Sequence, residues 1–250
     1  MAAVLLEEQG CKTGNPERGP LAPNNGGTGT EGGRRNSPLW LPHYWGLGGI
    51  LRQQANKTMT SQPQTDVIRD YHWTAPMFYR ALDAGAFGLW PKVELIRGRL
   101  VEHPGQTPRH ANTVNRIGRR FRQVLEPALQ VREHCPIAIT DDTHADTDIL
   151  VVKDFCSEYE KRHPGPSDTV LLVEVADASV EYDLGEKASI YAQANIAEHW
   201  VVLVQEAVIV VHRKPTSEGY RQIARLSGTN ALSPLAMPEV VWSVNTLLGW

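Results

Sequence analysis

A carboxylate stands inside one of the most apolar stretches of the chain. Glu174 follows the run VLLV at 170–173 and precedes Val175, and such a run is typical of a strand covered on both faces. An ionised carboxylate in that setting is costly unless it is paired, hydrogen-bonded or bound to a metal. Glu174 is therefore the first candidate for a site residue. The alternative, an ordinary strand residue, fits its apolar neighbours poorly.

A second carboxylate opens another apolar run. Asp148 precedes ILVV at 149–152, which predicts a second buried strand. Neighbouring strands lie ~4.8 Å apart, so Asp148 and Glu174 could share one cation. Oxygen ligands alone suit Mg²⁺ or Mn²⁺ rather than Zn²⁺, and such an ion can polarise a phosphodiester and lower the pKa of a bound water. Taken alone, Asp148 could also be a turn residue at a strand edge.

The segment after Glu174 predicts a helix with an ammonium group on one face. Asp183, Lys187 and Tyr191 are spaced four apart and therefore share a helix face. Lys187 could orient an attacking water or stabilise charge that develops on a phosphate. It could instead be the ion-pair partner of Asp183 on a solvated face. Asp183 has capping-box spacing to Glu186, and Tyr191 is interpreted as a core residue.

The remaining elements position these residues. They are a helix that begins after Thr74 and ends at Gly85 to Gly88, strands at 93–96 and 99–102, a helix from Arg109 to about Leu129, a strand at 131–139, a polar turn at 141–147, strands at 148–152 and 170–175, a hairpin at 198–204 and 208–213, and a strand at 220–226. Strands and helices are mixed along the chain, so the expected fold class is α/β, with a central mixed β-sheet flanked by helices.

The first 60 residues differ in composition from the rest. Glycine and proline are frequent between Gly10 and Gly33, and such a segment buries too little apolar surface to offset its ordering entropy. Residues 1–60 are predicted to be a disordered N-terminal extension, and residues 70–250 a single domain. MTSQPQTD from Met59 resembles an ordinary protein start, so the first 58 residues could be untranslated. An intact mass of the native protein would test this.

Composition limits the cellular setting. The cysteines Cys11, Cys135 and Cys156 form no CxxC pair and no disulfide framework, which favours the cytoplasm. The sequence contains no apolar run near the ~20 residues of a membrane span, and no basic segment precedes the short apolar run at the N-terminus. We therefore expect a cytoplasmic protein with no membrane partner.

A basic segment stands out in a chain whose formal net charge is −3. Because the whole molecule is not a polycation, nucleic-acid contact would have to come from a local patch. The best candidates are Arg109, Arg116, Arg119 and Arg120 on the predicted helix. Backbone phosphates are the expected ligands of such a patch. The alternative is a solvated helix face.

Several motifs occur in an order that resembles a known family. They are ELIRG at 94–98, TPRH at 107–110, DILVV at 148–152, VEVADAS at 173–179, Asp183, Lys187, EHWVV at 198–202 and the closing segment from 232 to 249. The chain resembles, from Tyr71 to Gly249, the “putative restriction endonuclease” family of the PD-(D/E)XK nuclease superfamily. The resemblance implies a restriction-endonuclease-like core.

The resemblance also implies roles for individual residues. Asp148 and Glu174 would hold Mg²⁺ or Mn²⁺, Lys187 would act with the attacking water, and Glu94 would be an additional acidic residue of the site. From its own neighbours Arg97 and Arg99, Glu94 could equally form a surface ion pair. His110 is considered only as a supporting group, because none of the nine histidines stands at ligand spacing from another.

The chain departs from the superfamily pattern at two positions. Thr147 replaces the proline before the aspartate, which leaves Asp146 as a second candidate for the metal ligand. Ala176 occupies the usual lysine position two residues after the glutamate. The family is known for a lysine relocated to the following helix, and Lys187 matches that arrangement.

Two functions follow from these observations. The first is a metal-dependent endonuclease that hydrolyses DNA phosphodiester bonds without a small-molecule cofactor. The second is a catalytically weak or inactive nuclease-like fold that acts as a nucleic-acid-binding or structural module. The missing proline keeps the second open, as does the absence of a recognisable recognition domain. A homodimer is also possible from the sequence, because two active sites together can cut both strands of a duplex.

Overall fold

The computed structural model describes residues 69–88, 92–103, 105–153 and 156–250. The predicted N-terminal extension and the alternative start at Met59 lie outside these residues.

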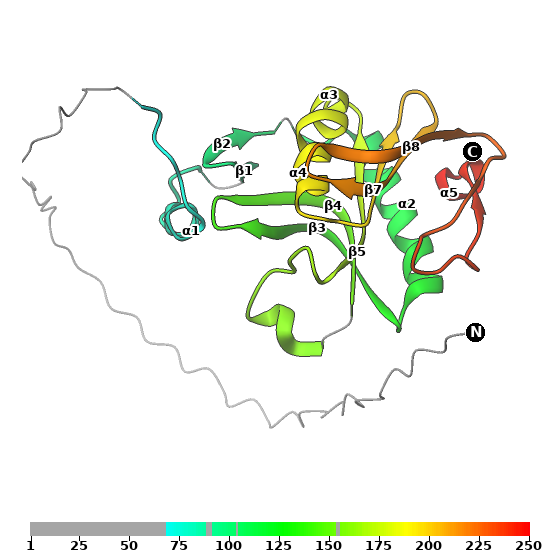
Figure 1. Cartoon of the computed structure of the whole chain (residues 1–250), viewed down its shortest axis with the longest axis horizontal. Coiled ribbons are helices and arrows are strands. Elements are labelled where there is room, and N and C mark those ends of the chain that lie inside the picture. Colours follow the sequence, from blue (N-terminus) through cyan, green and yellow to red (C-terminus); the bar gives the residue numbers. More distant parts are fainter. Residues whose placement is uncertain (1–68, 89–91, 104, 154–155) are drawn as a thin grey trace, which may run out of the picture. The chain divides into compact units, whose positions relative to one another are not determined.

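One mixed sheet forms the centre of the domain (Figure 1). Its strands follow the order β2 (Arg99–Glu102), β1 (Val93–Ile96), β4 (Thr143–Lys153), β5 (Thr169–Ala176), β6 (Glu198–Leu203), β7 (Val208–Thr216) and β8 (Gly219–Ser227), and β3 (Leu129–Thr140) also pairs with β4. β5 and β6 are parallel, and the other pairs are antiparallel. A small second sheet pairs β9 (Ala231–Leu232) with β10 (Trp242–Ser243). The predicted mixed sheet is confirmed, as is the adjacency of the strands of Asp148 and Glu174.

The two edges of β4 are used differently. β3 pairs along one edge from end to end. The other edge is shared, because β1 pairs with it at His144 and β5 pairs with it only from Ile149 onward. Main-chain groups of residues 145–148 that face this edge therefore need partners other than a neighbouring strand.

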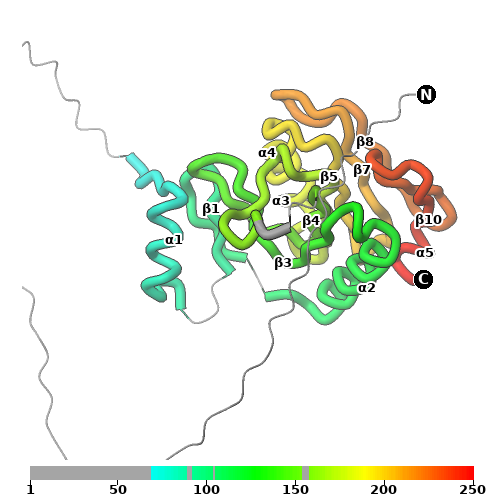
Figure 2. Tube along the Cα trace, turned by 90° about the horizontal axis from the view of Figure 1, so that it is seen from below, coloured from blue at the N-terminus to red at the C-terminus, as the bar shows by residue number. Residues whose placement is uncertain are grey.

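Helices cover both faces of the sheet (Figure 1). They are α1 (Ala75–Asp83), α2 (Pro108–Leu125), α3 (Val180–Tyr182), the π-helical segment η2 (Asp183–Lys187), α4 (Ala188–Gln193) and α5 (Val244–Leu248), with a 3₁₀ turn η1 (Cys156–Glu160). Ile117 of α2 packs in one cluster with Val173, and Tyr191 of α4 packs in another with Leu172. Successive strand residues point to opposite faces, so α2 and α4 lie on opposite sides of β5. α2, α5 and β10 lie together (Figure 2).

The N-terminal end of α2 has a defined side-chain cap. Thr107 is its N-cap, and the hydroxyl oxygen accepts a hydrogen bond from the main-chain N–H of His110 at 3.1 Å, as is usual for a threonine cap. The helix ends at Leu125, short of the predicted Leu129. Glu126 is extended because it precedes a proline, which disfavours helical backbone at that position.

The predicted polar turn at 141–147 is wrong. β4 begins at Thr143, so the turn is confined to residues 141 and 142. Thr143, Ala145 and Thr147 are buried, an alternation that belongs to a strand. Pairing with β3 thus prevails over the polar composition. Asp148 lies within a strand, and its interpretation as a turn residue is also wrong.

The helix that carries Lys187 is not uniform. Its middle turn, η2, is π-helical, between α3 and α4. Short π segments often occur at functional sites. Asp183 is not an N-cap, because it lies inside the helical run and its carboxylate accepts from Ser179 Oγ at 2.5 Å. Within the described ranges, the helices are too short or too polar to cross a membrane.

Candidate active site

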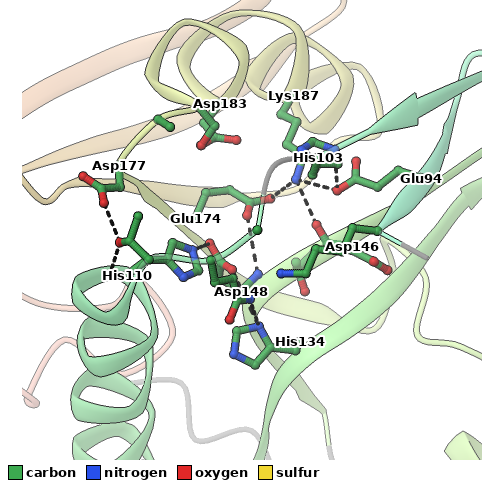
Figure 3. Close-up of a pocket in the computed structure, with 17 residues that line it drawn as sticks. Glu94, His103, His110, His134, Asp146, Asp148, Glu174, Asp177, Asp183 and Lys187 are labelled. Carbon is green, nitrogen blue, oxygen red and sulfur yellow. Dashed lines mark hydrogen bonds and ion pairs between the residues drawn. The ribbon is translucent and has the colours of Figure 1, made fainter. Parts of the chain in front are cut away.

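A pocket of about 310 Å³ opens at the split between β1 and β5 (Figure 3). It is lined by Lys92, Glu94, His103, Gly105, Gln106, Thr107, His110, His134, Asp146, Thr147, Asp148, Glu174, Asp177, Ala178, Ser179, Asp183 and Lys187. These residues come from β1, β3, β4, β5, η2 and the start of α2, and from the segments that precede β1, follow β2 and follow β5. The four proposed catalytic residues, Glu94, Asp148, Glu174 and Lys187, therefore meet in one cavity.

Side chains of the site satisfy the main chain where the strands diverge. Lys187 Nζ donates to the carbonyl oxygen of Asp146 at 2.9 Å. The amide of Val175 donates to Asp148 Oδ2 at 2.8 Å, and the amide of Asp148 approaches Glu174 Oε2 at 3.4 Å. The same groups thus hold the split open and form the wall of the pocket.

Glu174 is almost completely buried, with 2% of its surface exposed. Its Oε1 accepts from Tyr191 Oη at 2.6 Å and from Lys187 Nζ at 3.2 Å. Burial raises the pKa of Glu174 well above its usual value, although the charge of Lys187 opposes the shift, and Asp148 raises it further. Two adjacent carboxylates with one compensating lysine leave excess negative charge that a cation would neutralise.

Asp148 faces Glu174 across the pair β4–β5. Its Oδ2 accepts from His110 Nε2 at 3.1 Å as well as from the Val175 amide. Burial acts to raise the pKa of Asp148, but the hydrogen bond and charge of His110 hold it below its usual value. The pKa values of the two carboxyl groups are thus shifted in opposite directions. Asp148 retains its negative charge more readily than Glu174 does.

Lys187 is a buried ammonium between two carboxylates. Nζ lies 3.1 Å from Glu94 Oε1 and 3.2 Å from Glu174 Oε1. Burial acts to lower the pKa of Lys187, but Glu174 and its acidic neighbours raise it well above its usual value. Lys187 is therefore charged at neutral pH. It can donate hydrogen bonds and stabilise negative charge, but it cannot accept a proton from water.

Glu94 lies in the pocket and not on the surface. Its side chain is 3% exposed, and its Oε1 lies 3.1 Å from both His103 Nε2 and Lys187 Nζ (Figure 3). Burial acts to raise its pKa, but Lys187 holds the pKa below the usual value. The alternative of a surface ion pair with Arg97 or Arg99 is wrong, because those side chains bond to the helix that carries Lys187.

Asp146, the second candidate for a metal ligand, lines the same pocket but stands farther out. It is exposed, whereas the side chain of Asp148 is 16% exposed. Partial desolvation in the pocket, together with the charge of Glu94, raises the pKa of Asp146 to about 6. Its main-chain carbonyl, not its carboxylate, binds Lys187. The geometry therefore favours Asp148 as the partner of Glu174.

From the sequence, His110 was considered only as a supporting group, and His103 and His134 were missed. His103 approaches Glu94, His110 bonds to Asp148, and His134 Nδ1 lies 3.7 Å from Asp148 Oδ1. His134 has a left-handed backbone with φ 50° inside β3, a strained conformation that often marks functional positions. TPRH at the start of α2 was a usable signal for His110. For the other two histidines the sequence carried no such signal.

The proposed nucleic-acid contacts on α2 are Arg109, Arg116, Arg119 and Arg120. They differ in exposure and in their partners. Arg109 bonds to Gln205 Oε1 at 2.7 Å near the pocket. Arg116 is half-buried and donates to the carbonyl of Leu248, so it ties α2 to α5. Arg119 is exposed and Arg120 half-buried. The exposed arginines are the better placed to meet a phosphate.

The residues present fit a magnesium-type ion better than a zinc-type ion. Within the part of the chain that the structure describes, no group of three or more His, Cys, Asp or Glu side chains is arranged to hold a metal. Mg²⁺ commonly binds through one or two carboxylates and keeps several waters. Asp148 and Glu174 supply two carboxylates, and both residues line the pocket.

The same fold occurs in a solved structure. The chain is similar to a “putative nuclease belonging to DUF820” from Anabaena variabilis, with a TM-score of 0.56 and 15% sequence identity over 71% of this chain and 98% of that one. The mixed sheet with helices on both faces is therefore a restriction-endonuclease-like fold.

Residues 77–245 match the family model of Uma2, described as “putative restriction endonuclease”. The chain belongs to this family. No curated protein matches it. Family and fold together indicate a nuclease, as the sequence resemblance implied.

Proposed function

We propose that this protein is a metal-dependent endonuclease that hydrolyses phosphodiester bonds of DNA. The observation that carries the proposal is the pair Asp148 and Glu174 on adjacent strands, beside the charged ammonium of Lys187. The like-charged carboxylates form a buried site for a divalent cation, and the ammonium is placed beside the same cavity. Membership of the nuclease family supports this assignment.

Asp148 and Glu174 would hold Mg²⁺ or Mn²⁺ through their carboxylate oxygens. When bound, such an ion lowers the pKa of a coordinated water and polarises the phosphate. The ammonium hydrogens of Lys187 are taken by the Asp146 carbonyl and by Glu174 and Glu94. Lys187 therefore stabilises negative charge on the phosphate oxygens through its positive charge at the wall of the cavity, as water adds and the bond to the leaving oxygen breaks. Glu94 keeps Lys187 charged and in place, since its carboxylate lies 3.1 Å from the ammonium.

Nicking of supercoiled plasmid DNA tests the proposal. Cleavage should require Mg²⁺ or Mn²⁺ and should stop with EDTA, and a structured RNA in parallel reactions identifies the nucleic acid. Asp148→Asn and Glu174→Gln should each abolish cleavage and weaken Mn²⁺ binding in calorimetry. Asp141→Asn, an exposed turn carboxylate outside the pocket lining, is the matched control and should behave as the unaltered protein does.

The alternative, an inactive nuclease-like module, gives a different result. It predicts nucleic-acid binding without cleavage under every metal condition. If Asp146→Asn abolished cleavage while Asp148→Asn did not, the metal ligand would be Asp146, and the substitution of Thr147 for the usual proline would mark that change.

A further inference from the structure

His110 is aimed at one particular oxygen of Asp148. Its Nε2 lies 3.1 Å from Oδ2, and the amide of Val175 donates to the same oxygen at 2.8 Å. The imidazole is 12% exposed, so water competes poorly for this contact. Two donors therefore occupy Oδ2 and leave Oδ1 on the side of His134, at the open pocket (Figure 3).

The proton on this hydrogen bond belongs to His110. An ionised carboxylate only accepts hydrogen bonds, so in the contact between Oδ2 and His110 the hydrogen is carried by Nε2. In the described residues, the other ring nitrogen, Nδ1, is buried without a hydrogen-bond partner. A group that makes its one bond to the candidate ligand serves the orientation of that ligand.

A chain of hydrogen bonds holds His110 in place. Thr107 caps α2 through the amide of His110, and the Thr107 hydroxyl donates to Asp177 Oδ2 at 2.6 Å. Asp177 directly follows β5, the strand of Glu174. Gln205 donates to the other oxygen of Asp177 at 2.5 Å. The first turn of α2 is thus tied to the end of β5, and His110 meets Asp148 in a predetermined position.

We propose that His110 is a positioning residue that orients Asp148 for cation binding. Its Nε2–H fixes Oδ2 and keeps the Oδ1 lone pairs available to the ion. The inference rests on the proposed function, because it assigns His110 to the same metal site. Hydrogen bonds from outside the ligand set commonly change metal affinity by ~10–100-fold when they are removed, which sets the size of the expected effect.

Mn²⁺ titrations of the full chain by calorimetry test the proposal without depending on activity. His110→Ala and His110→Asn, whose amide is too short to reach Oδ2, should each raise the Mn²⁺ dissociation constant about 10–100-fold. His110→Gln places an amide N–H near the position of Nε2 and should restore affinity to within a few-fold. Plasmid cleavage by the Ala and Asn variants should recover at saturating Mn²⁺.

A second histidine provides the control. His144 is half-buried and hydrogen-bonded to Tyr79 Oη at 2.9 Å, and it lies outside the pocket lining. His144→Gln should leave the Mn²⁺ dissociation constant unchanged. If the Ala variant fails to fold, the Asn and Gln pair gives the same comparison.

Two results would overturn the inference. One is unchanged Mn²⁺ affinity in His110→Ala and His110→Asn. The other is an equal loss of affinity in all three His110 variants, because rescue by Gln is what a hydrogen bond predicts. Absence of Mn²⁺ binding by the unaltered protein would be a different failure, since it would overturn the proposed function itself.

Discussion

Two glutamates are buried on the neighbouring strands β5 and β6, and their surroundings differ. Glu198 is 0% exposed and Glu174 is 2% exposed. Oε1 of Glu198 accepts from Nε and Nη2 of Arg213 at 2.8 and 2.6 Å and from Trp200 Nε1 at 2.9 Å, and its Oε2 accepts from the amide of Leu235 at 2.7 Å. Its charge is fully compensated.

Glu174 has a less complete set of partners. Its Oε2 is approached by one amide at 3.4 Å, and the like-charged Asp148 lies beside it. Glu174 lines the pocket, whereas Glu198 does not. Glu198 shares the strand face of Trp200 and the cluster under α2, and Glu174 points toward α4. Burial of a carboxylate thus does not by itself mark a functional site. What makes Glu174 the candidate is a second carboxylate, Asp148, beside it at an open pocket.

The largest expected effect is a difference in the free energy of unfolding between variants of these two glutamates. Removing one partner of a buried ion pair costs about 3–5 kcal/mol, so Glu198→Gln should lose about 3 kcal/mol of stability. Glutamine is neutral and keeps one oxygen, so Arg213 loses its charged partner, and either the donors to Oε1 or the Leu235 amide loses its acceptor. Glu174→Gln should unfold no more easily than the unaltered protein, since it removes one of two adjacent charges and keeps an acceptor for Tyr191. Urea denaturation measures both. A large loss in Glu174→Gln would show that its charge is structural.

Lys187 and Arg213 extend the comparison to the cations. Lys187→Met should reduce cleavage about 10²–10³-fold, the usual cost of removing a group that stabilises transition-state charge, while Mn²⁺ affinity stays within a few-fold because both carboxylates remain. Arg213→Met should lower the midpoint of urea denaturation yet retain cleavage per folded molecule. Plasmid assays with calorimetry test both variants. Cleavage at the unaltered rate by Lys187→Met would make Lys187 only a structural partner of its neighbouring carboxylates.

Buried histidines provide a pH-dependent contrast to the carboxylates. The rings of His199 and His212 stack with centroids 5.1 Å apart, among Tyr191 and Tyr220. Burial lowers the pKa of both, and His212 and Lys187 lower that of His199 further. The unfolded chain takes up protons near pH 6.5 and the folded chain resists them. Stability contributed by these groups is therefore present above about pH 6.5 and is lost as pH falls below it.

The loss should approach about 1.4 kcal/mol per pH unit for each histidine. His212→Phe should remove one such contribution, so its free energy of unfolding should fall less steeply than that of the unaltered protein between pH 7 and pH 5.5. Urea denaturation at a series of pH values measures the difference. Parallel curves for the two proteins would mean that His212 is protonated equally in the folded and unfolded states.

The smallest expected effect concerns the arginines of α2. Arg109 and Arg119 are exposed, and each phosphate contact contributes about 0.9 to the slope of log K against log salt concentration. Replacing either arginine with Ala should reduce the salt slope by about 0.9, the contribution of one phosphate contact. Arg116→Ala should mainly lower the thermal midpoint, because Arg116 binds the carbonyl of Leu248. An unchanged salt slope for Arg109→Ala and Arg119→Ala would return α2 to the role of a solvated helix.

Local sequence patterns determined most of the elements of the described domain. Apolar runs specified the strands of Asp148 and Glu174, and three-to-four periodicity specified α2, because such patterns depend on neighbours along the chain. The ordered motifs also pointed to the family and to Glu94, Asp148, Glu174 and Lys187. The sequence did not reveal that β4 continues back to Thr143, since its pairing with β3 outweighs the polar composition of that segment.

Only the tertiary structure decided how the candidate site is completed. The choice of Asp148 over Asp146 depends on where β1 and β5 leave the edge of β4. His103, His110 and His134 reach the carboxylates from three separate segments. The contrast between Glu174 and Glu198 depends on Lys187 in η2 and on Arg213 in β7. Each of these contacts joins residues distant in sequence, and their charges and hydrogen bonds act through space, so a pattern of neighbours along the chain carries no record of them.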